Sequence, residues 1–320
     1  MSRPFDQEWR KICLYLILTL VLGALLAPCL YLFGKEIVHQ GWLDKSETAY
    51  LHGALDRAKF PRYFNRAILI AAVFGMIPLI RSLRFRGWKD LQIVPNRCAS
   101  MDMIAGILLG AGFLLFMGAA FLYMRPSPFV TEAEPGWSFI PGIIVSALAV
   151  GFLEEYFFRG AMLGVCLRKM RVWSAVFVTS LIYAIVHFLK PDRHMELGNI
   201  EWHTGFKLLG SAFARLGEMQ SFLAEFTTLL VVGVVLALVR LRTRSLWLAI
   251  GLHAGWVFGL KLFGKLTDKS DALHEWSPWI GNDLKTGLIP LVVVFFTGAF
   301  ASLWIDLSRK PVLSEQREDA

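Results

Sequence analysis

Eight long stretches of the sequence contain no Asp, Glu, Lys or Arg, and this feature constrains the fold more than any other. A membrane-spanning helix needs about 20 mostly apolar residues, within a range of about 17–25. The stretches are continuously apolar rather than alternating, which excludes a membrane β-barrel. We predict that each forms a helix, at residues 12–34, 67–80, 103–124, 135–153, 172–189, 226–239, 245–260 and 286–305.

The composition agrees with an all-α, polytopic integral membrane helix bundle of about eight transmembrane helices. Only 18% of the residues are charged, against about 25% in soluble domains. The runs at 67–80, 226–239 and 245–260 are short, so they span a membrane only if flanking charged side chains snorkel or face the protein interior. No appended soluble domain is evident, and we predict that residues 1–320 form a single integral membrane domain.

The net charge of +8 is expected of cytoplasmic loops that face anionic lipid, so we read it as no sign of a nucleic-acid partner. With the N-terminus placed inside, the cytoplasmic segments hold 17 Lys and Arg in 59 residues, and the outer segments hold 15 in 103. This density predicts that both termini are cytoplasmic. From the compact, single-domain form we expect the inner membrane of a bacterium.

Ionisable side chains lie within three of the apolar helices, where each is costly unless it is paired or functional. Glu155 and Arg159 are four residues apart on the fourth helix, so they share a face and are expected to form an ion pair. Glu154 points about 100° away and lacks that partner. A carboxylate without a partner in a low-dielectric pocket is suited to act as a base.

The depths of these groups also agree. Glu154 lies fourteen residues before Arg168, and His187 lies fourteen residues after Trp173, on either side of a short turn. At about 1.5 Å per residue, both side chains are expected about 21 Å from that turn. His253, on the seventh helix, joins them only if that helix is tilted or starts deeper. A purely structural interpretation stays open, because a buried His is often an interhelical hydrogen bonder.

Three motifs on successive apolar helices resemble those of the CAAX protease and bacteriocin-processing family, also called the ABI family. They are Glu154-Glu155-x-x-x-Arg159, the aromatic-x-x-x-His of Tyr183 and His187, and His253 after a Ser-Leu-Trp run. The best-studied branch that they resemble is the type II CAAX prenyl endopeptidases. The resemblance covers about residues 138–263, which we interpret as the catalytic core.

The resemblance implies an intramembrane endopeptidase that depends on glutamate and needs no metal or other cofactor. Glu154 with His187 would activate the attacking water, and His253 would help to stabilise the tetrahedral oxyanion. Glu155 and Arg159 would support the site. This agrees with the chemistry of amide hydrolysis, which needs a base for water and donors for the oxyanion. The substrate would be a membrane-associated or lipidated protein or peptide in the bilayer, cut near its end.

The sequence departs from the family pattern at two positions. Tyr183 stands where the family usually has Phe, and Val257 stands where it usually has Asn, four residues after His253. Val cannot donate a hydrogen bond, and the loss of one oxyanion donor typically costs about 10²–10³ in rate. Trp256 Nε1 or the Tyr183 hydroxyl would then have to serve as the donor, or the activity is weak.

Three other functions compete with this interpretation. A non-proteolytic member of the family, such as an immunity factor or a scaffold, is favoured by Val257. A metal-dependent protease would use Glu154, His187 and His253 as ligands of a divalent metal such as zinc, since zinc sites use His and Glu with an open position. A transporter would show inverted repeats or broken helices, and the sequence shows neither.

Overall fold

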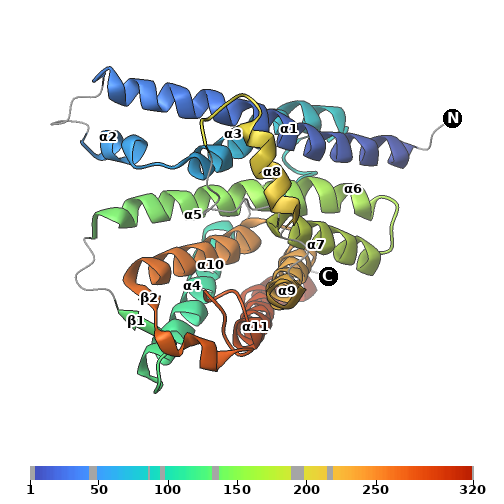
Figure 1. Cartoon of the computed structure of the whole chain (residues 1–320). Helices are drawn as coiled ribbons and strands as arrows, with labels where there is room; N and C mark the ends of the chain where they lie inside the picture. The colour runs from blue at the N-terminus through green and yellow to red at the C-terminus, as the bar shows by residue number, and fades with distance from the viewer. Residues whose placement is uncertain are drawn as a thin grey trace. The chain divides into compact units, whose positions relative to one another are not determined.

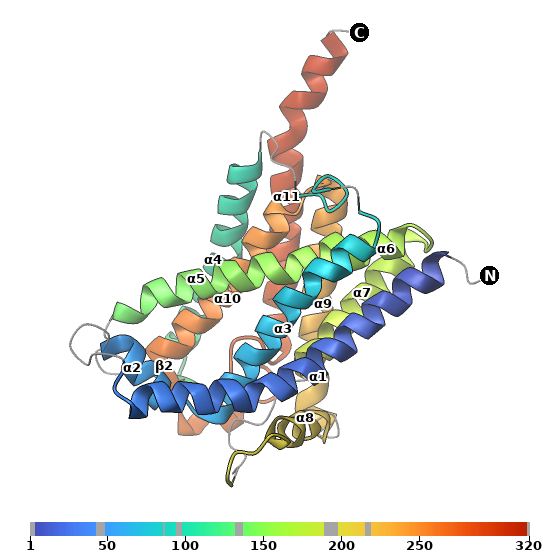
Figure 2. The same cartoon turned by 90° about the horizontal axis from the view of Figure 1, so that it is seen from above.

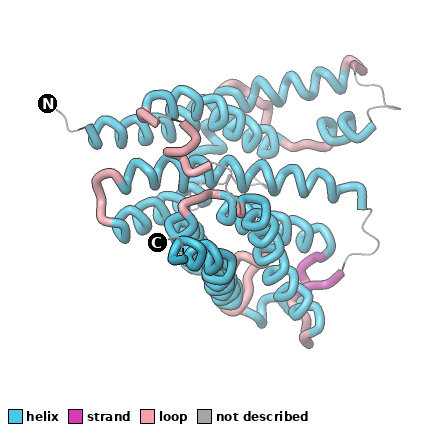
Figure 3. Tube along the Cα trace, turned by 180° about the vertical axis from the view of Figure 1, so that it is seen from behind, coloured by secondary structure: helices cyan, strands magenta, loops and turns pink. Residues whose placement is uncertain are grey.

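The computed structural model describes residues 4–42, 49–85, 87–93, 98–131, 137–188, 198–214 and 219–318. These residues are almost entirely helical, with one short pair of strands between them (Figure 3). The prediction of an all-α, polytopic membrane helix bundle is confirmed.

Seven helices in the described part of the chain are long and apolar enough to cross a membrane. They include most of each of seven predicted runs and lie at Gln7–His39, Phe60–Ser82, Ala99–Tyr123, Trp137–Leu167, Leu223–Thr243, Trp247–Leu266 and Leu288–Arg309. The run at 172–189 forms α7 (Val172–Phe188), whose apolar part, Val172–His187, is shorter than the other spans. Residues 135, 136 and 189 of the predicted runs lie outside the described residues.

The three short runs become longer helices because charged residues are included at their ends. Arg66 in α3 (Phe60–Ser82) is exposed, whereas Arg240 near the end of α9 (Met219–Thr243) is buried. Lys261 in α10 (Trp247–Leu266) donates to the hydroxyl of Ser146. Both ways of including a charged residue in a span therefore occur, one facing outward and one facing the protein.

The chain divides into two compact units, the first of residues 1–84 and 187–217 and the second of residues 85–186 and 218–320. Each unit is described by itself. The interpretation of residues 1–320 as one membrane domain stays a prediction.

The first unit is built on α1 (Pro4–His39), which packs against α3 and α8 (Thr204–Ala214), with the short α2 (Ala49–Asp56) following α1. Figure 1 shows α1 and α3 at the blue end of the colour bar. Small residues allow the close approach. Their shared core contains Ala24, Ala27, Phe60, Phe64, Ala67 and Leu208.

The second unit holds the remaining elements. They are α4 (Ala99–Tyr123), β1 (Phe129–Thr131), η1 (Trp137–Phe139), α5 (Ile140–Glu155), the π-helix η2 (Tyr156–Met162), α6 (Leu163–Leu167), α7 except for its last two residues, α9, α10, β2 (Thr267–Lys269), η4 (Asp271–Trp276) and α11 (Leu288–Glu318). Strands β1 and β2 are antiparallel, with Val130 opposite Asp268. Helix α10 packs against α4, α5 and α9 (Figures 1 and 2).

Helices α4 and α10 approach so closely because glycines face each other along their contact. Gly106 and Gly110 on α4 meet Gly251 and Gly255 on α10, and a Cβ built on Gly251 would lie only 2.3 Å from the carbonyl oxygen of Met103. Each pair has the glycine-x-x-x-glycine spacing that brings membrane helices into backbone contact. This close contact fixes the position of α10 relative to α4.

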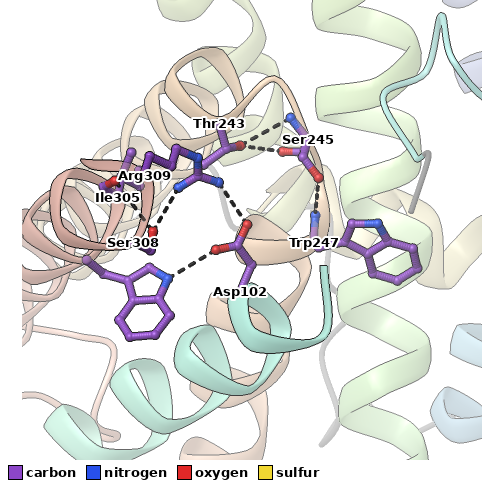
Figure 4. Close-up of polar contacts among 8 residues, drawn as sticks. Asp102, Thr243, Ser245, Trp247, Ile305, Ser308 and Arg309 are labelled. Carbon is purple, nitrogen blue, oxygen red and sulfur yellow. Dashed lines mark hydrogen bonds and ion pairs between the residues drawn. The ribbon is translucent and has the colours of Figure 1, made fainter. Parts of the chain in front are cut away.

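The beginning of α10 is held by a local hydrogen-bonded turn. The Thr243 hydroxyl donates to the carbonyl oxygen of Ser245 (2.7 Å), and the Ser245 hydroxyl accepts from the backbone N–H of Trp247 (3.4 Å). Figure 4 shows this turn beside a second cluster, in which buried Asp102 accepts from Arg309 (2.9 Å) and from the indole of Trp304 (3.0 Å). The second cluster joins the start of α4 to α11.

Candidate active site

Glu155 lies at the centre of a buried polar cluster in the second unit. It is the last residue of α5 and is 0% exposed. Its Oε1 accepts a hydrogen bond from Arg159 Nη1 at 2.8 Å and lies 2.8 Å from Nδ1 of His253. Two polar side chains thus converge on one carboxylate oxygen, which joins the fourth apolar helix to α10.

Arg159 is held by contacts with three other elements. It is buried in the π-helix, and besides its ion pair with Glu155 it donates from Nη2 to the carbonyl oxygen of Gly233 on α9 at 3.3 Å. Its guanidinium carbon lies 4.4 Å from the centre of the Tyr183 ring on α7. The predicted contact between Glu155 and Arg159 is confirmed, and the arginine also locks neighbouring helices together.

His253 faces both glutamates. The imidazole is buried, with Nδ1 against Glu155 and Nε2 at 3.7 Å from Oε2 of Glu154. Helix α10 thus brings the imidazole of His253 to Glu154. If the imidazole is neutral, its Nδ1–H donates to Glu155, and Nε2 is the nitrogen that faces Glu154. Glu155 thus sets the orientation of the ring.

The direction of His253 follows from the glycines of its helix. His253 lies two residues after Gly251 and two before Gly255, so it points about 200° from each of them around the helix. Because the glycines face α4, the imidazole faces the opposite side, where α5 lies. There Gly151 allows the approach, since a Cβ on it would lie 3.0 Å from the backbone nitrogen of Ala254.

The depth expected for Glu154 assumed a regular α-helix up to Arg168. The structure differs, because the helix that carries the glutamates is interrupted. It becomes a π-helix at Tyr156 and returns to an α-helix at Leu163. A π-helix has a wider turn and is frequent at functional sites. The wide turn begins directly after Glu154 and Glu155 and contains Arg159, so it changes how the three side chains are spread around the helix.

The supporting residues lie on two of the same helices. Tyr183 is buried, and its ring centre is 6.1 Å from that of His253. Trp256 is buried one turn after His253, and its Nε1 has no hydrogen-bond partner among the described residues. Val257 is half-buried on the same helix. The role of Trp256 as a donor stays a prediction.

His187 lies near the end of α7 and is half-buried. It belongs to the first unit, whereas Glu154 and His253 belong to the second. Its place beside Glu154, expected from the equal offsets of the two residues from the turn, stays a prediction.

A metal site was the alternative for these residues. Among the described residues, no group of three or more His, Cys, Asp or Glu side chains has the arrangement of metal ligands. Glu154 and His253 supply one pair of ligand atoms, with Glu155 oriented as a carboxylate partner of the imidazole. The third expected ligand, His187, lies in the other unit, so both the metal-free and the metal-dependent mechanisms stay predictions.

The segment that holds this cluster is similar to a known protein family. Residues 136–259 match the model of a family described as type II CAAX prenyl endopeptidase Rce1-like. This segment is therefore similar to the CAAX proteases. The match confirms the resemblance predicted from the three motifs and supports a membrane-bound hydrolase of this general type. Neither the search of curated proteins nor the search of solved structures found a match.

Some members of the cluster were not found from the sequence. The bond from His253 to Glu155 was not predicted, because the sequence placed this histidine with Glu154 and His187 and gave Glu155 only Arg159 as a partner. The hydrogen bond from Arg159 to the backbone carbonyl of Gly233 could not be predicted, because a backbone acceptor is present at every residue and the sequence does not mark it. The role of α4, which lies outside the matched segment, does have a signal in the repeated spacing of Gly106-x-x-x-Gly110 and Gly251-x-x-x-Gly255.

Proposed function

We propose that this protein is an intramembrane endopeptidase that cleaves a peptide bond near the end of a membrane-associated or lipidated protein. The observation that carries the proposal is the convergence of Glu154, Glu155 and His253 in a buried site between two apolar helices. Two carboxylates and an imidazole are the groups that proton transfer to and from an attacking water requires.

In this proposal Glu154, together with His187, takes the proton of the attacking water. In its doubly protonated form, His253 donates from Nδ1 to Glu155 and from Nε2 to the oxyanion that forms on the scissile carbonyl. Arg159 keeps Glu155 in place by its 2.8 Å ion pair. Since Val257 cannot donate a hydrogen bond, the N–H of Trp256 is the second donor that we propose for the oxyanion.

The membrane context follows from the same features. Seven long apolar helices in the described part of the chain support an integral membrane protein. We propose that α7 completes eight crossings, so that both termini face the cytoplasm, and that the membrane is the inner membrane of a bacterium. The substrate then reaches the site from within the bilayer and needs no nucleic acid or soluble partner.

The test is a Glu154→Gln variant, which keeps the shape of the side chain and removes the base. Membranes containing the wild type, Glu154→Gln or the exposed control Glu275→Gln are compared for new protein termini and for cleavage of a synthetic prenylated peptide. We expect cleavage by the wild type and by the control only. Unchanged cleavage by Glu154→Gln, with thermal stability equal to that of the wild type, would contradict the proposal.

A chelator distinguishes the metal-dependent alternative. Without a metal, activity stays unchanged in the presence of a zinc chelator, whereas a zinc protease loses it and regains it on addition of zinc. The replacement of the family's usual Asn by Val257 favours a non-proteolytic relative as the second candidate. Absence of any new terminus in the wild-type membrane proteome, with the protein folded, would favour that candidate.

A further inference from the structure

A second polar site lies in the second unit, where two apolar spans end. A cavity of about 410 Å³ is lined by Gln92, by Gly164 and Arg168 around the end of α6, and by Arg240 on the last turn of α9. This volume falls within the range of about 300–1,000 Å³ that is usual for small-ligand sites. None of these residues belongs to the cluster around Glu155.

Arg240 is the unusual member of this cavity. Its side chain is 4% exposed, its Nε is buried without a hydrogen-bond partner, and it forms no ion pair within the described residues. The other arginines nearby are paired: Arg242 donates to Asp306 at 2.6 Å, and Arg309 donates to Asp102 at 2.9 Å. A buried guanidinium without an anion is costly. The described residues therefore give Arg240 no anionic partner.

Gln92 supplies a second observation at the same place. Its backbone has φ +59, a left-handed conformation that is strained for a residue other than glycine. Its side-chain Oε1 is buried without a partner, and its backbone carbonyl accepts from the N–H of Leu246 at 3.0 Å. Because the two ends of an amide are exchanged by a half-turn, the same side chain can present its NH₂ group to an anion in the cavity.

The remaining charges of the cavity leave it positive. Arg168 lies 4.6 Å from the centre of the Phe85 ring, and Asp90 contributes one carboxylate to the lining. Both Arg168 and Asp90 have polar interactions of their own within the protein. Two guanidinium groups against one carboxylate give the lining a net charge of about +1, and Arg240 forms no ion pair with any residue that the structure describes.

We propose that this cavity binds a phosphate group, held by Arg240 and Gln92, and that the phosphate is the headgroup of an anionic phospholipid. The position of the cavity at the ends of two membrane spans favours a lipid. Leu167 and Thr243 are the last residues of the two spans, so Arg168 and Arg240 lie at the level where a span meets the headgroups. Basic pockets between membrane helices are known to select such headgroups. Arginine is also the side chain best suited to phosphate oxygens.

The experiment measures binding to the full-length protein, purified in a neutral detergent. Phosphatidylglycerol, phosphatidylcholine with the same acyl chains, and inorganic phosphate at constant ionic strength are titrated separately, and the melting temperature and the apparent affinity are recorded. A ligand that binds only the folded state raises the melting temperature with its concentration. The variant is Arg240→Gln, and the control is Arg242→Gln, an exposed arginine on the same helix.

We expect phosphatidylglycerol to raise the melting temperature of the wild type and of Arg242→Gln, and phosphatidylcholine to have no such effect. Arg240→Gln should bind phosphatidylglycerol about 10- to 100-fold more weakly, because the loss of a hydrogen bond to a charged group lowers binding affinity by about this factor. An equal effect of inorganic phosphate would keep the site and make free phosphate its ligand. Absence of binding by both phosphatidylglycerol and inorganic phosphate, or undiminished binding by Arg240→Gln, would overturn the proposal.

A second variant covers the case in which Arg240→Gln does not fold. Gln92→Gly removes the amide and suits the left-handed backbone, so it should be at least as stable as the wild type. It should weaken the binding of phosphatidylglycerol, whereas wild-type affinity in this variant would contradict the proposal. Because the measurement is binding and not peptide cleavage, its result is independent of the proposed endopeptidase activity.

Discussion

Substituting Gly251 by Ala tests whether the packing of α4 against α10 positions His253. The added Cβ would lie 2.3 Å from the Met103 carbonyl oxygen and 3.1 Å from the Cα of Gly106. Ordinary contacts begin at 3.4 Å, so the two backbones must separate locally by about 1 Å. Helix α10 cannot move freely the other way, because Gly151 of α5 already lies against Ala254.

Two effects are expected. Overpacking of this kind lowers the free energy of unfolding by about 1–3 kcal/mol. A shift of about 1 Å in a catalytic group can also cost about 10²-fold in rate, and His253 lies only two residues from the substitution. The hydrogen bond of 2.8 Å between His253 and Glu155 has little room for such a shift. We therefore expect a loss of kcat that exceeds the change in KM.

The matched control is Gly264→Ala, on the same helix, where an added Cβ meets no atom within 4 Å. This change should be neutral or stabilise the helix by up to about 1 kcal/mol, because alanine is the better helix former. Melting temperature and cleavage of the prenylated peptide are measured for both variants, below the lower melting temperature. If Gly251→Ala behaves like Gly264→Ala in both measurements, the positioning role of the glycine contact is wrong.

Three further predictions concern single residues or topology. Arg159→Ala should lower the free energy of unfolding by about 3–5 kcal/mol in chemical denaturation, because it removes the arginine partner of the buried Glu155 carboxylate; a fully stable but inactive variant would instead make Arg159 a direct substrate-binding group. Val257→Asn should raise peptidase activity or leave it unchanged, and a sharp loss would show that Val257 forms part of a substrate pocket. Reporter fusions at Lys45, which lies outside the described residues, and at Arg317 should report opposite sides of the membrane, whereas reports from the same side would contradict the count of eight spans.

The sequence alone was sufficient for the helices and for contacts within one helix. The spacing of charge-free runs predicted every span, because the length of an apolar run and the thickness of a bilayer are both fixed. The pair of Glu155 and Arg159 was predicted for a similar reason, since residues four apart share a face of any helix. The three motifs also identified the family of residues 136–259 correctly.

The tertiary structure decided which helix faces meet. His253 bonds to Glu155 across 98 residues of chain, and this choice depends on the glycines that turn one face of α10 toward α4. The π-helix after Glu155 and the unpaired Arg240 likewise depend on packing, which can outweigh local preference. Contacts within one helix follow from the helical period, so they can be predicted from residue spacing in the sequence. Contacts between helices depend on how closely the backbones approach, and this is determined only when the helices have packed.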